Sequence, residues 1–182
     1  MLPERGRLLI SEPFLGDPYF KRTVILLCDH DKEGSFGFIL NKYVDLTLPD
    51  ILEGLPHLNN RISVGGPVLN TNLYYIHTLG DMVEGSQLVG EGIWMGGDFE
   101  QIQSFMLTGV IKADQIRFFV GYSGWSENQL ETELEEKSWY VCDAQNIPIM
   151  DTMRDDIWSV ALREMGGDFA NLAHFPSDPT LN

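Results

Sequence analysis

The sequence has few cysteines, few basic residues and no long apolar run. Its 182 residues include two cysteines, Cys28 and Cys142, and each lies in an apolar run typical of a β-strand. A free cysteine there behaves as a small hydrophobic side chain, so we expect two reduced thiols. Apolar runs such as 24–28 end at charged residues and fall far short of the roughly 20 residues that cross a bilayer. Residues 1–6 lack the features of a secretory signal, which predicts a cytoplasmic protein without a membrane partner.

Basic residues are scarce and unevenly placed. The chain has 12 Lys+Arg against 27 Asp+Glu, a formal net charge of −15. Residues 1–42 hold six cations and six anions, so residues 43–182 hold six cations and twenty-one anions. Because nucleic-acid binding draws most of its affinity from Lys and Arg on phosphates, this balance predicts no direct binding to DNA unless the N-terminal cations cluster in space.

The remaining composition is that of an ordinary globular protein, with 43% hydrophobic and 21% charged residues, and we expect one domain over residues 1–182. Short β-branched or aromatic runs bounded by turn residues predict seven strands, at 6–10, 23–29, 35–40, 62–64, 72–78, 115–121 and 139–143. Glycine-rich turns cut the middle third into short pieces suited to hairpins. Strands and helices do not alternate regularly, which favours a mixed α+β fold.

Helix signals are fewer than strand signals. We predict a short helix after Thr47, and others at 99–108, from Ser126 through Glu136, and at 153–165. Ser126 and Gln129 have the spacing of a capping box. Thr152 is the expected cap of the last helix, and Gly166-Gly167 its stop. The final residues, 175–182, are irregular, and we expect them to pack as a tail.

Five ordered blocks of the sequence resemble the YqgE/AlgH family over essentially the whole chain. They are Gly6-Arg7-Leu8-Leu9-Ile10 running on to Leu40-Asn41, Gly65-Gly66-Pro67-Val68, Gly121-Tyr122-Ser123-Gly124-Trp125 with Gln129-Leu130, Trp158 through Gly166-Gly167-Asp168, and Asp178 to Asn182. The chain departs from the family at Tyr43, Asn128 and Thr180, where Pro, Gly and Ser are usual. The resemblance implies an α+β fold whose bifurcated sheet curls into a partial barrel with flanking helices. The family name implies a transcriptional regulator, although the family has no recognised helix-turn-helix.

The block at 121–125 places Ser123 where a strand is expected to lead into a capped helix, as a hydrolase nucleophile does. A nucleophile elbow needs Gly-x-Ser-x-Gly, and Trp125 occupies the second glycine position. No histidine is placed to act as the base. We therefore interpret the segment as a structural turn in which Trp125 anchors the start of the helix.

Other potential sites are incomplete. Cys28 and His30 share a strand face by spacing, but the other histidines and Cys142 lack paired ligand spacing, so no metal site and no cofactor is predicted. Gly65 and Gly66 could present amides to an anion, although tight turning explains them as well. The acidic run Glu131 to Glu136 is typical of a solvated helix face, and a surface for a basic partner is the alternative.

These observations favour a non-enzymatic binding or regulatory module whose partner is an unknown protein or small molecule. No catalytic residue is assigned. The candidate ligand-binding residues are Arg22, Asn41, Gly65, Gly66, Trp125 and Gln129. An enzyme with a pocket at these positions is one alternative, and a DNA-binding regulator that uses Lys21 and Arg22 is another.

Overall fold

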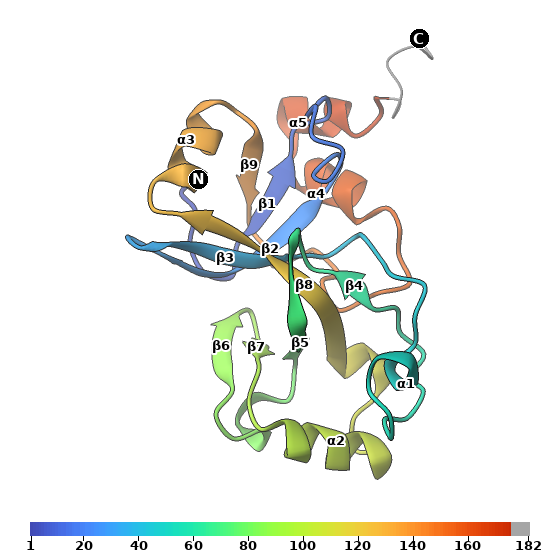
Figure 1. Cartoon of the computed structure of the whole chain (residues 1–182). Coiled ribbons are helices and arrows are strands. Elements are labelled where there is room, and N and C mark those ends of the chain that lie inside the picture. The colour runs from blue at the N-terminus through green and yellow to red at the C-terminus, as the bar shows by residue number, and fades with distance from the viewer. Residues whose placement is uncertain (176–182) are drawn as a thin grey trace.

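Nine strands form one open sheet in the computed structural model, which describes residues 1–175. They run in the order β6-β7-β5-β8-β3-β2-β1-β9, and β4 pairs with β8 off this path (Figure 1). Their bounds are β1 Leu8–Ser11, β2 Val24–Asp31, β3 Gly34–Ile39, β4 Ser63–Val64, β5 Val68–His77, β6 Gln87–Gly90, β7 Ile93–Met95, β8 Ile116–Ser126 and β9 Trp139–Cys142. All seven predicted strands are present, and the hairpin β6–β7 adds two from the glycine-rich middle third.

The sheet divides at β8. Residues 116–120 of this strand pair with β5 on one side, and residues 119–120 pair with the parallel strand β4 on the other. Residues 123–126 pair with β3 instead. The sheet also curls, because Gly6, ahead of β1, lies against β6, where an added Cβ would come within 2.8 Å of the carbonyl oxygen of Val89. The expected mixed, bifurcated sheet that forms a partial barrel is therefore confirmed.

β8 is longer than predicted, and this corrects the interpretation of residues 121–125. The segment is not a turn into a helix but the second half of the strand. Gly121 has φ of +71°, and the register of β5 shifts opposite it, between Val68 and Leu73. An L side chain rarely adopts that φ, so glycine lets the strand bulge there and continue into the other half of the sheet.

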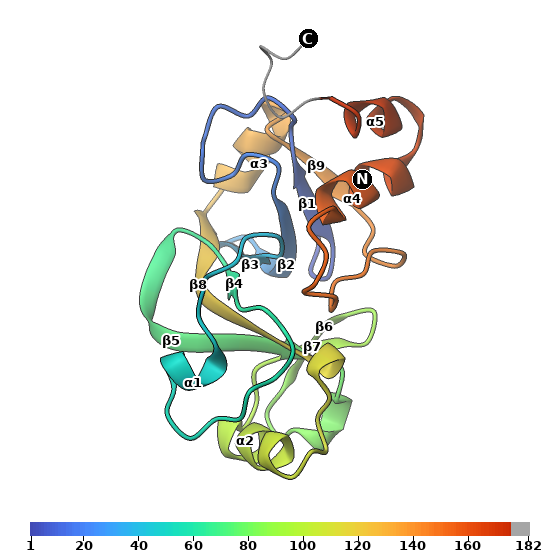
Figure 2. The same cartoon turned by 90° about the vertical axis from the view of Figure 1, so that its right-hand side faces the viewer.

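Helices cover both ends of the sheet. They are α1 Leu48–Ile51, α2 Phe99–Leu107, α3 Gln129–Glu135, α4 Ile157–Met165 and α5 Gly167–Leu172, with 3₁₀ turns at Gly80–Met82 and Ala113–Gln115. In Figure 1, α3, α4 and α5 lie with β1, β2, β3 and β9 in the upper half, and α1 and α2 lie with β4 to β7 in the lower half. Figure 2 shows β8 passing through both halves. No helix in the described part of the chain is long and apolar enough to cross a membrane.

Two predicted helix starts are wrong. The last long helix begins at Ile157 rather than after Thr152, because Thr152 is used elsewhere and its hydroxyl accepts the backbone N–H of Arg61 at 3.0 Å. The predicted stop is confirmed, because α4 ends at Met165 with Gly166 as its C-cap, and a separate short helix, α5, begins at Gly167. The helix expected from Ser126 begins at Gln129, whose side-chain oxygen accepts the Ser126 N–H at 3.0 Å, so one half of the predicted capping box is present.

Three apolar clusters fill the protein. The largest lies between the sheet and α4, where Trp158, Ala161 and Leu162 are buried. A second packs α1 and α2 against the lower half of the sheet, and a third lies beneath α3 around Trp125 and Trp139. The predicted tail begins at Phe175, whose ring packs edge-on against Phe14 at 5.6 Å. The rest of the tail, 176–182, lies outside the described residues.

Candidate functional site

A carboxylate held by two indoles is the main polar feature of the upper half. One oxygen of Glu133, on α3, accepts the indole N–H of Trp125 at 2.9 Å and that of Trp139 at 2.7 Å. The other oxygen accepts the side-chain amide of Gln129 at 2.9 Å. Both indoles are buried and meet edge to face, with centroids 6.2 Å apart. We call Glu133, Trp125, Trp139 and Gln129 the indole clamp.

The indole clamp forms one wall of a groove of about 370 Å³. The other walls come from Pro67 and from the loop that contains Asp17 and Phe20. Phe20 packs edge-on against Trp139 at 5.4 Å, so the groove combines apolar ring surface with two carboxylates, those of Glu133 and Asp17. Among the described residues, neither carboxylate has a basic partner within 4.0 Å. The arrangement provides fixed acceptors that a donor or cation could use.

The Gly65-Gly66 pair packs closely against β8. The N–H of Gly65 donates to the carbonyl of Val120 at 2.9 Å, and an added Cβ on Gly65 would lie 2.3 Å from the carbonyl oxygen of Gly121. An added Cβ on Gly66 would lie 2.2 Å from the carbonyl group of Tyr122. Glycine is therefore needed here because β8 passes so near. The carbonyl of Gly66 accepts the hydroxyl of Tyr19 at 3.1 Å, and the next residue, Pro67, lines the groove.

Arg22 and Asn41 lie together but outside the groove. The side chain of Asn41 donates to the carbonyl of Arg22 at 2.7 Å and accepts the N–H of Val24 at 2.9 Å, so it ties β2 to the end of β3. The guanidinium of Arg22 lies 4.6 Å from the ring centroid of Trp158 and donates to the carbonyl of Phe175. Of the six candidates, Trp125 and Gln129 line the groove, Gly66 adjoins it, and Arg22, Asn41 and Gly65 have structural contacts elsewhere.

The potential nucleophiles are buried. Ser123 is 1% exposed, and its hydroxyl donates to the carbonyl of Gly65 at 3.2 Å. Burial raises the pKa of the Cys28 thiol, and the nearby Asp29 raises it further. Burial, Asp143 and Glu164 together raise the pKa of Cys142 to about 11. Both cysteines are free, as expected, and both are protonated at neutral pH.

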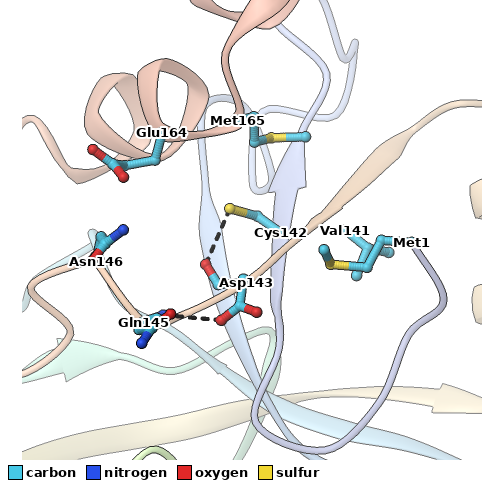
Figure 3. A pocket seen from close by; sticks show the side chains of 8 residues that line it. All are labelled: Met1, Val141, Cys142, Asp143, Gln145, Asn146, Glu164 and Met165. Carbon is cyan, nitrogen blue, oxygen red and sulfur yellow. Dashed lines mark hydrogen bonds between the residues drawn. The ribbon is translucent and has the colours of Figure 1, made fainter.

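Cys142 lies beside a second hollow, of about 310 Å³, between β9 and α4 (Figure 3). Its thiol donates to the carbonyl of Asp143 at 3.2 Å, and Met165 and Glu164 lie across the hollow. His30, on β2, makes a hydrogen bond of 2.8 Å to Ser35 and is not in this hollow. No group of three or more His, Cys, Asp or Glu side chains in residues 1–175 is placed to hold a metal ion.

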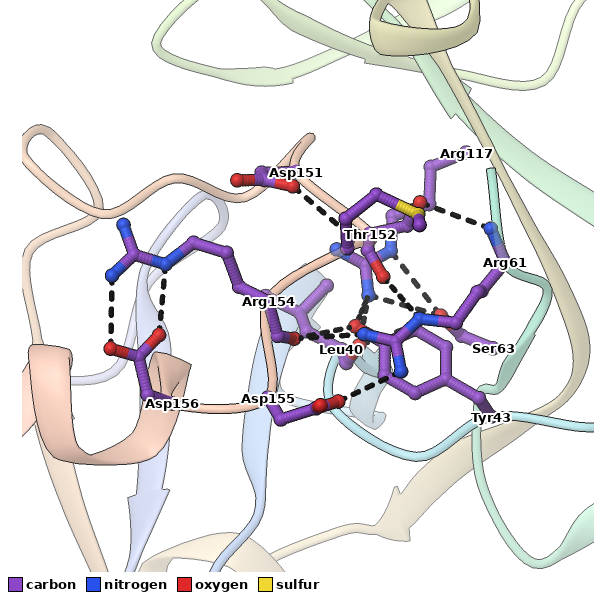
Figure 4. Close-up of polar contacts among 11 residues, drawn as sticks. Leu40, Tyr43, Arg61, Ser63, Arg117, Asp151, Thr152, Arg154, Asp155 and Asp156 are labelled. Carbon is purple, nitrogen blue, oxygen red and sulfur yellow. Dashed lines mark hydrogen bonds and ion pairs between the residues drawn. The ribbon is translucent and has the colours of Figure 1, made fainter. Parts of the chain in front are cut away.

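A buried arginine that the sequence analysis did not single out joins the two halves of the protein. Arg117, on β8, is 0% exposed and donates to the carbonyls of Leu40 and Ile149 and, at 3.0 Å, to the hydroxyl of Ser63. Desolvation lowers its pKa to about 10, so it stays charged at neutral pH. Figure 4 shows a second layer, in which Arg61 lies 3.7 Å from the ring centroid of Tyr43 and pairs with Asp155. The local sequence offers one sign of this buried role, a basic residue within an apolar strand.

Comparison with known proteins identifies the family. An AlgH-like family model matches residues 8–170. The chain belongs to the AlgH-like family. It is 42% identical over 177 residues to a UPF0301 protein of Chlorobaculum tepidum, covering 97% of this chain and 95% of that protein. It is 41% identical over 183 residues to a UPF0301 protein of Bacteroides thetaiotaomicron, covering 100% and 93%.

Two solved structures resemble this AlgH-like fold. The solution structure of the AlgH protein from Pseudomonas aeruginosa aligns with a TM-score of 0.74 at 26% identity over 94% of each chain. The crystal structure of protein DIP2367 from Corynebacterium diphtheriae aligns with a TM-score of 0.79 over 96% of this chain and 94% of that one. Its identity of 21% shows the fold alone. The family resemblance inferred from the sequence blocks is confirmed.

Proposed function

We propose that this AlgH-like protein is a non-enzymatic binding or regulatory module that acts in the cytoplasm, and that the groove beside the indole clamp contacts its ligand. The carrying observation is the fixed carboxylate of Glu133, which three N–H donors hold at the wall of an open groove. A group that is already oriented loses little conformational entropy when a ligand binds, so such a wall favours recognition.

The surroundings of the potential nucleophiles support binding over catalysis. Ser123 is bonded to a backbone carbonyl, and the thiols of Cys28 and Cys142 have raised pKa values. A nucleophile of this kind needs an adjacent base or a lowered pKa to react. Residues 1–175 give none of these three side chains an adjacent base or a lowered pKa.

The placement of the basic side chains supports contacts with proteins or small molecules rather than with DNA. Arg5 pairs with Asp29 at 2.6 Å, and Arg7 pairs with Glu4 at 3.1 Å. Arg22 is bonded to the carbonyl of Phe175. Each of these three cations is thus already bonded within the protein and is less available to phosphates, which supports a regulatory role through another partner.

The test is affinity capture of the tagged protein from its native cytosol, with proteins, nucleic acids and metabolites analysed together. The groove variant carries Asp17→Asn and Gln129→Ala, two exposed positions whose change spares the buried indoles. The matched control carries Asp81→Asn and Gln87→Ala, at exposed positions of the lower half. We expect a ligand that the wild type and the control retain and the groove variant loses.

Two results would contradict this proposal. A captured ligand that the groove variant holds as tightly as the wild type would place the contact elsewhere. Turnover of a captured metabolite by the purified wild type would make the protein an enzyme. Direct titration of the captured compound against the three purified proteins separates these cases.

A further inference from the structure

Part of one edge of β5 has no partner strand among residues 1–175. β8 pairs with one side of β5, and β7 pairs with the other side only at Ile76 and His77. The carbonyl of Tyr75 accepts the N–H of Gly96 at 3.1 Å, so its backbone groups point to the β7 side. Backbone groups alternate in direction along a strand, so those of Leu73 point the same way. No strand of the described chain covers that side of Leu73.

This edge lines a groove of about 500 Å³. Five consecutive residues, 71–75, contribute to it, together with Ile51 and Leu52 beside α1 and Phe99 at the start of α2. Because side chains alternate between the faces of a sheet, consecutive residues all line one groove only where the strand's edge faces it. In Figure 2, β5 runs along the outside of the lower half, with α1 and α2 below it.

The unpaired edge of β5 carries no charged side chain. Residues 62–80 contain no Lys, Arg, Asp or Glu, although charged residues make up 21% of the chain. Lys, Pro or an inward charge is the usual defence of an edge strand against unwanted pairing. Leu69, in the bulge of β5, is 69% exposed, and Val68 is 39% exposed. An uncharged edge beside an apolar groove is suited to receive another segment.

Acidic residues surround this uncharged edge. Asp50 and Glu53 flank the groove residues of α1, and Asp98 and Glu100 flank Phe99, and all four are exposed. None has a basic partner within 4.0 Å in the described chain. Across residues 43–111 the only cation is Arg61, against eight anions, and Arg61 already pairs with Asp155 at 2.8 Å. The field around the groove is therefore negative on both sides.

We propose that the open edge of β5 docks an extended segment of a partner protein, with apolar residues at its centre and Lys or Arg at its ends. The segment adds a strand through the free backbone groups of β5, fills the groove with its apolar side chains and pairs its ends with the acidic rim. A second copy of the chain is a poorer occupant, because it would bring the same carboxylates against the rim. This surface is separate from the indole-clamp groove.

The probe is a displayed library of random linear peptides, selected against the full chain. Peptides that enrich should alternate apolar residues and carry basic ends. Thr71→Lys places a charge at the exposed edge and should weaken the enriched peptides by roughly tenfold or more, because it repels their basic ends. The matched control, Thr132→Lys at an exposed position of α3, should bind as the wild type does. Amide hydrogen exchange at Leu73 should slow when peptide is bound.

A rim variant tests the charge requirement. Glu53→Lys with Glu100→Lys should weaken basic-ended peptides at least about tenfold and should leave peptides with neutral ends nearly unchanged. The groove variant Asp17→Asn with Gln129→Ala should bind the peptides normally, so failure of the upper groove as a site leaves this result intact. The proposal is overturned if no peptide enriches, if Thr71→Lys has no effect, or if sedimentation shows a dimer that Thr71→Lys dissociates.

Discussion

Two charged side chains of opposite sign are each held without an oppositely charged partner, one between the halves of the protein and one in the upper half. Arg117 is fully buried and donates to carbonyl and hydroxyl oxygens. Glu133 is half-buried and accepts indole and amide N–H groups. Both side chains lose hydrating water when they are buried, and hydrogen bonds from or to the protein replace it. A buried charge is tolerated only with such hydrogen bonds.

The difference lies in what each charge can still reach. The donors of Arg117 are consumed by segments around Leu40, Ser63 and Ile149, which come from separate parts of the chain, so the side chain acts as a structural junction. Glu133 stands at the wall of an open groove, where a ligand can approach it. A charge at the centre of the fold stabilises one arrangement of the segments, whereas a charge at a groove is available for recognition.

The largest effect is expected at the junction. Arg117→Met keeps much of the side-chain volume but leaves buried carbonyls without donors, and should lower the free energy of unfolding by about 3 kcal/mol or more. Urea denaturation followed by circular dichroism measures this loss. Arg163→Met, at an exposed position of α4, is the matched control and should change stability little. Equal stability of the two variants would show that Arg117 is not a junction.

A smaller effect is expected at the indole clamp. Glu133→Leu leaves two buried indole N–H groups without acceptors and should lower the free energy of unfolding by about 2 kcal/mol. Glu133→Gln keeps one acceptor oxygen and should cost less than half as much. Urea denaturation gives the stabilities, and near-ultraviolet circular dichroism reports the packing of the two indoles. If Leu and Gln had the same effect, the carboxylate would not be holding the indoles.

The sequence predicted the secondary-structure elements better than it predicted the roles of Arg117 and Glu133. Strands followed from local apolar runs, and α2 lies within the predicted range 99–108, with the carboxylate of Asp98 accepting the N–H groups of Glu100 and Gln101 at its start. Arg117 and Glu133 depend on partners far along the chain or on other elements, which no local pattern contains. Thr152 had the pattern of a helix cap, but a tertiary contact with Arg61 overrode it.

The candidate site was predicted only in part, for the same reason. Trp125 and Gln129 lie on adjacent elements and line the groove, so their closeness in sequence was informative. The sequence analysis assigned Glu133 to a solvated acidic helix face. The acidic run from Glu131 to Glu136 contains no local sign of the two indole donors. Glu133 is recognised as the acceptor of both indoles only from the three-dimensional arrangement of β8, α3 and β9.

His77, a buried residue in the lower half, should make the stability of the protein depend on pH. Burial lowers the pKa of His77 below its ordinary value of 6.5, although its hydrogen bond to the carbonyl of Gly96 partly opposes this. Below pH about 6.5 the imidazole of His77 therefore binds a proton more readily in the unfolded chain than in the folded chain. The free energy of unfolding falls as the pH drops below about 6.5. One group contributes at most about 1.4 kcal/mol per pH unit.

The measurement is urea denaturation of the wild type and of His77→Gln between pH 7.5 and pH 5, a range chosen around that ordinary pKa. The variant should lose stability less steeply as the pH falls. His57→Gln, at an exposed position, is the control and should keep the slope of the wild type. Parallel curves for all three proteins would mean that His77 takes up protons equally well when folded.

The smallest effect is expected at the exposed member of the indole clamp, and it sharpens the distinction between a structural charge and an available one. Gln129→Ala removes the amide that orients one oxygen of Glu133 and the acceptor of the Ser126 N–H, both at exposed positions, but leaves both indole bonds in place. Stability should fall by no more than about 0.5 kcal/mol, because the lost contacts are exposed. If the groove binds a ligand through Glu133, affinity for that ligand should fall more than stability does. Isothermal titration with the captured ligand, set beside urea denaturation of the same variant, compares the two losses. A variant that lost stability heavily while binding normally would place Gln129 with Arg117, among the groups that only hold the fold together.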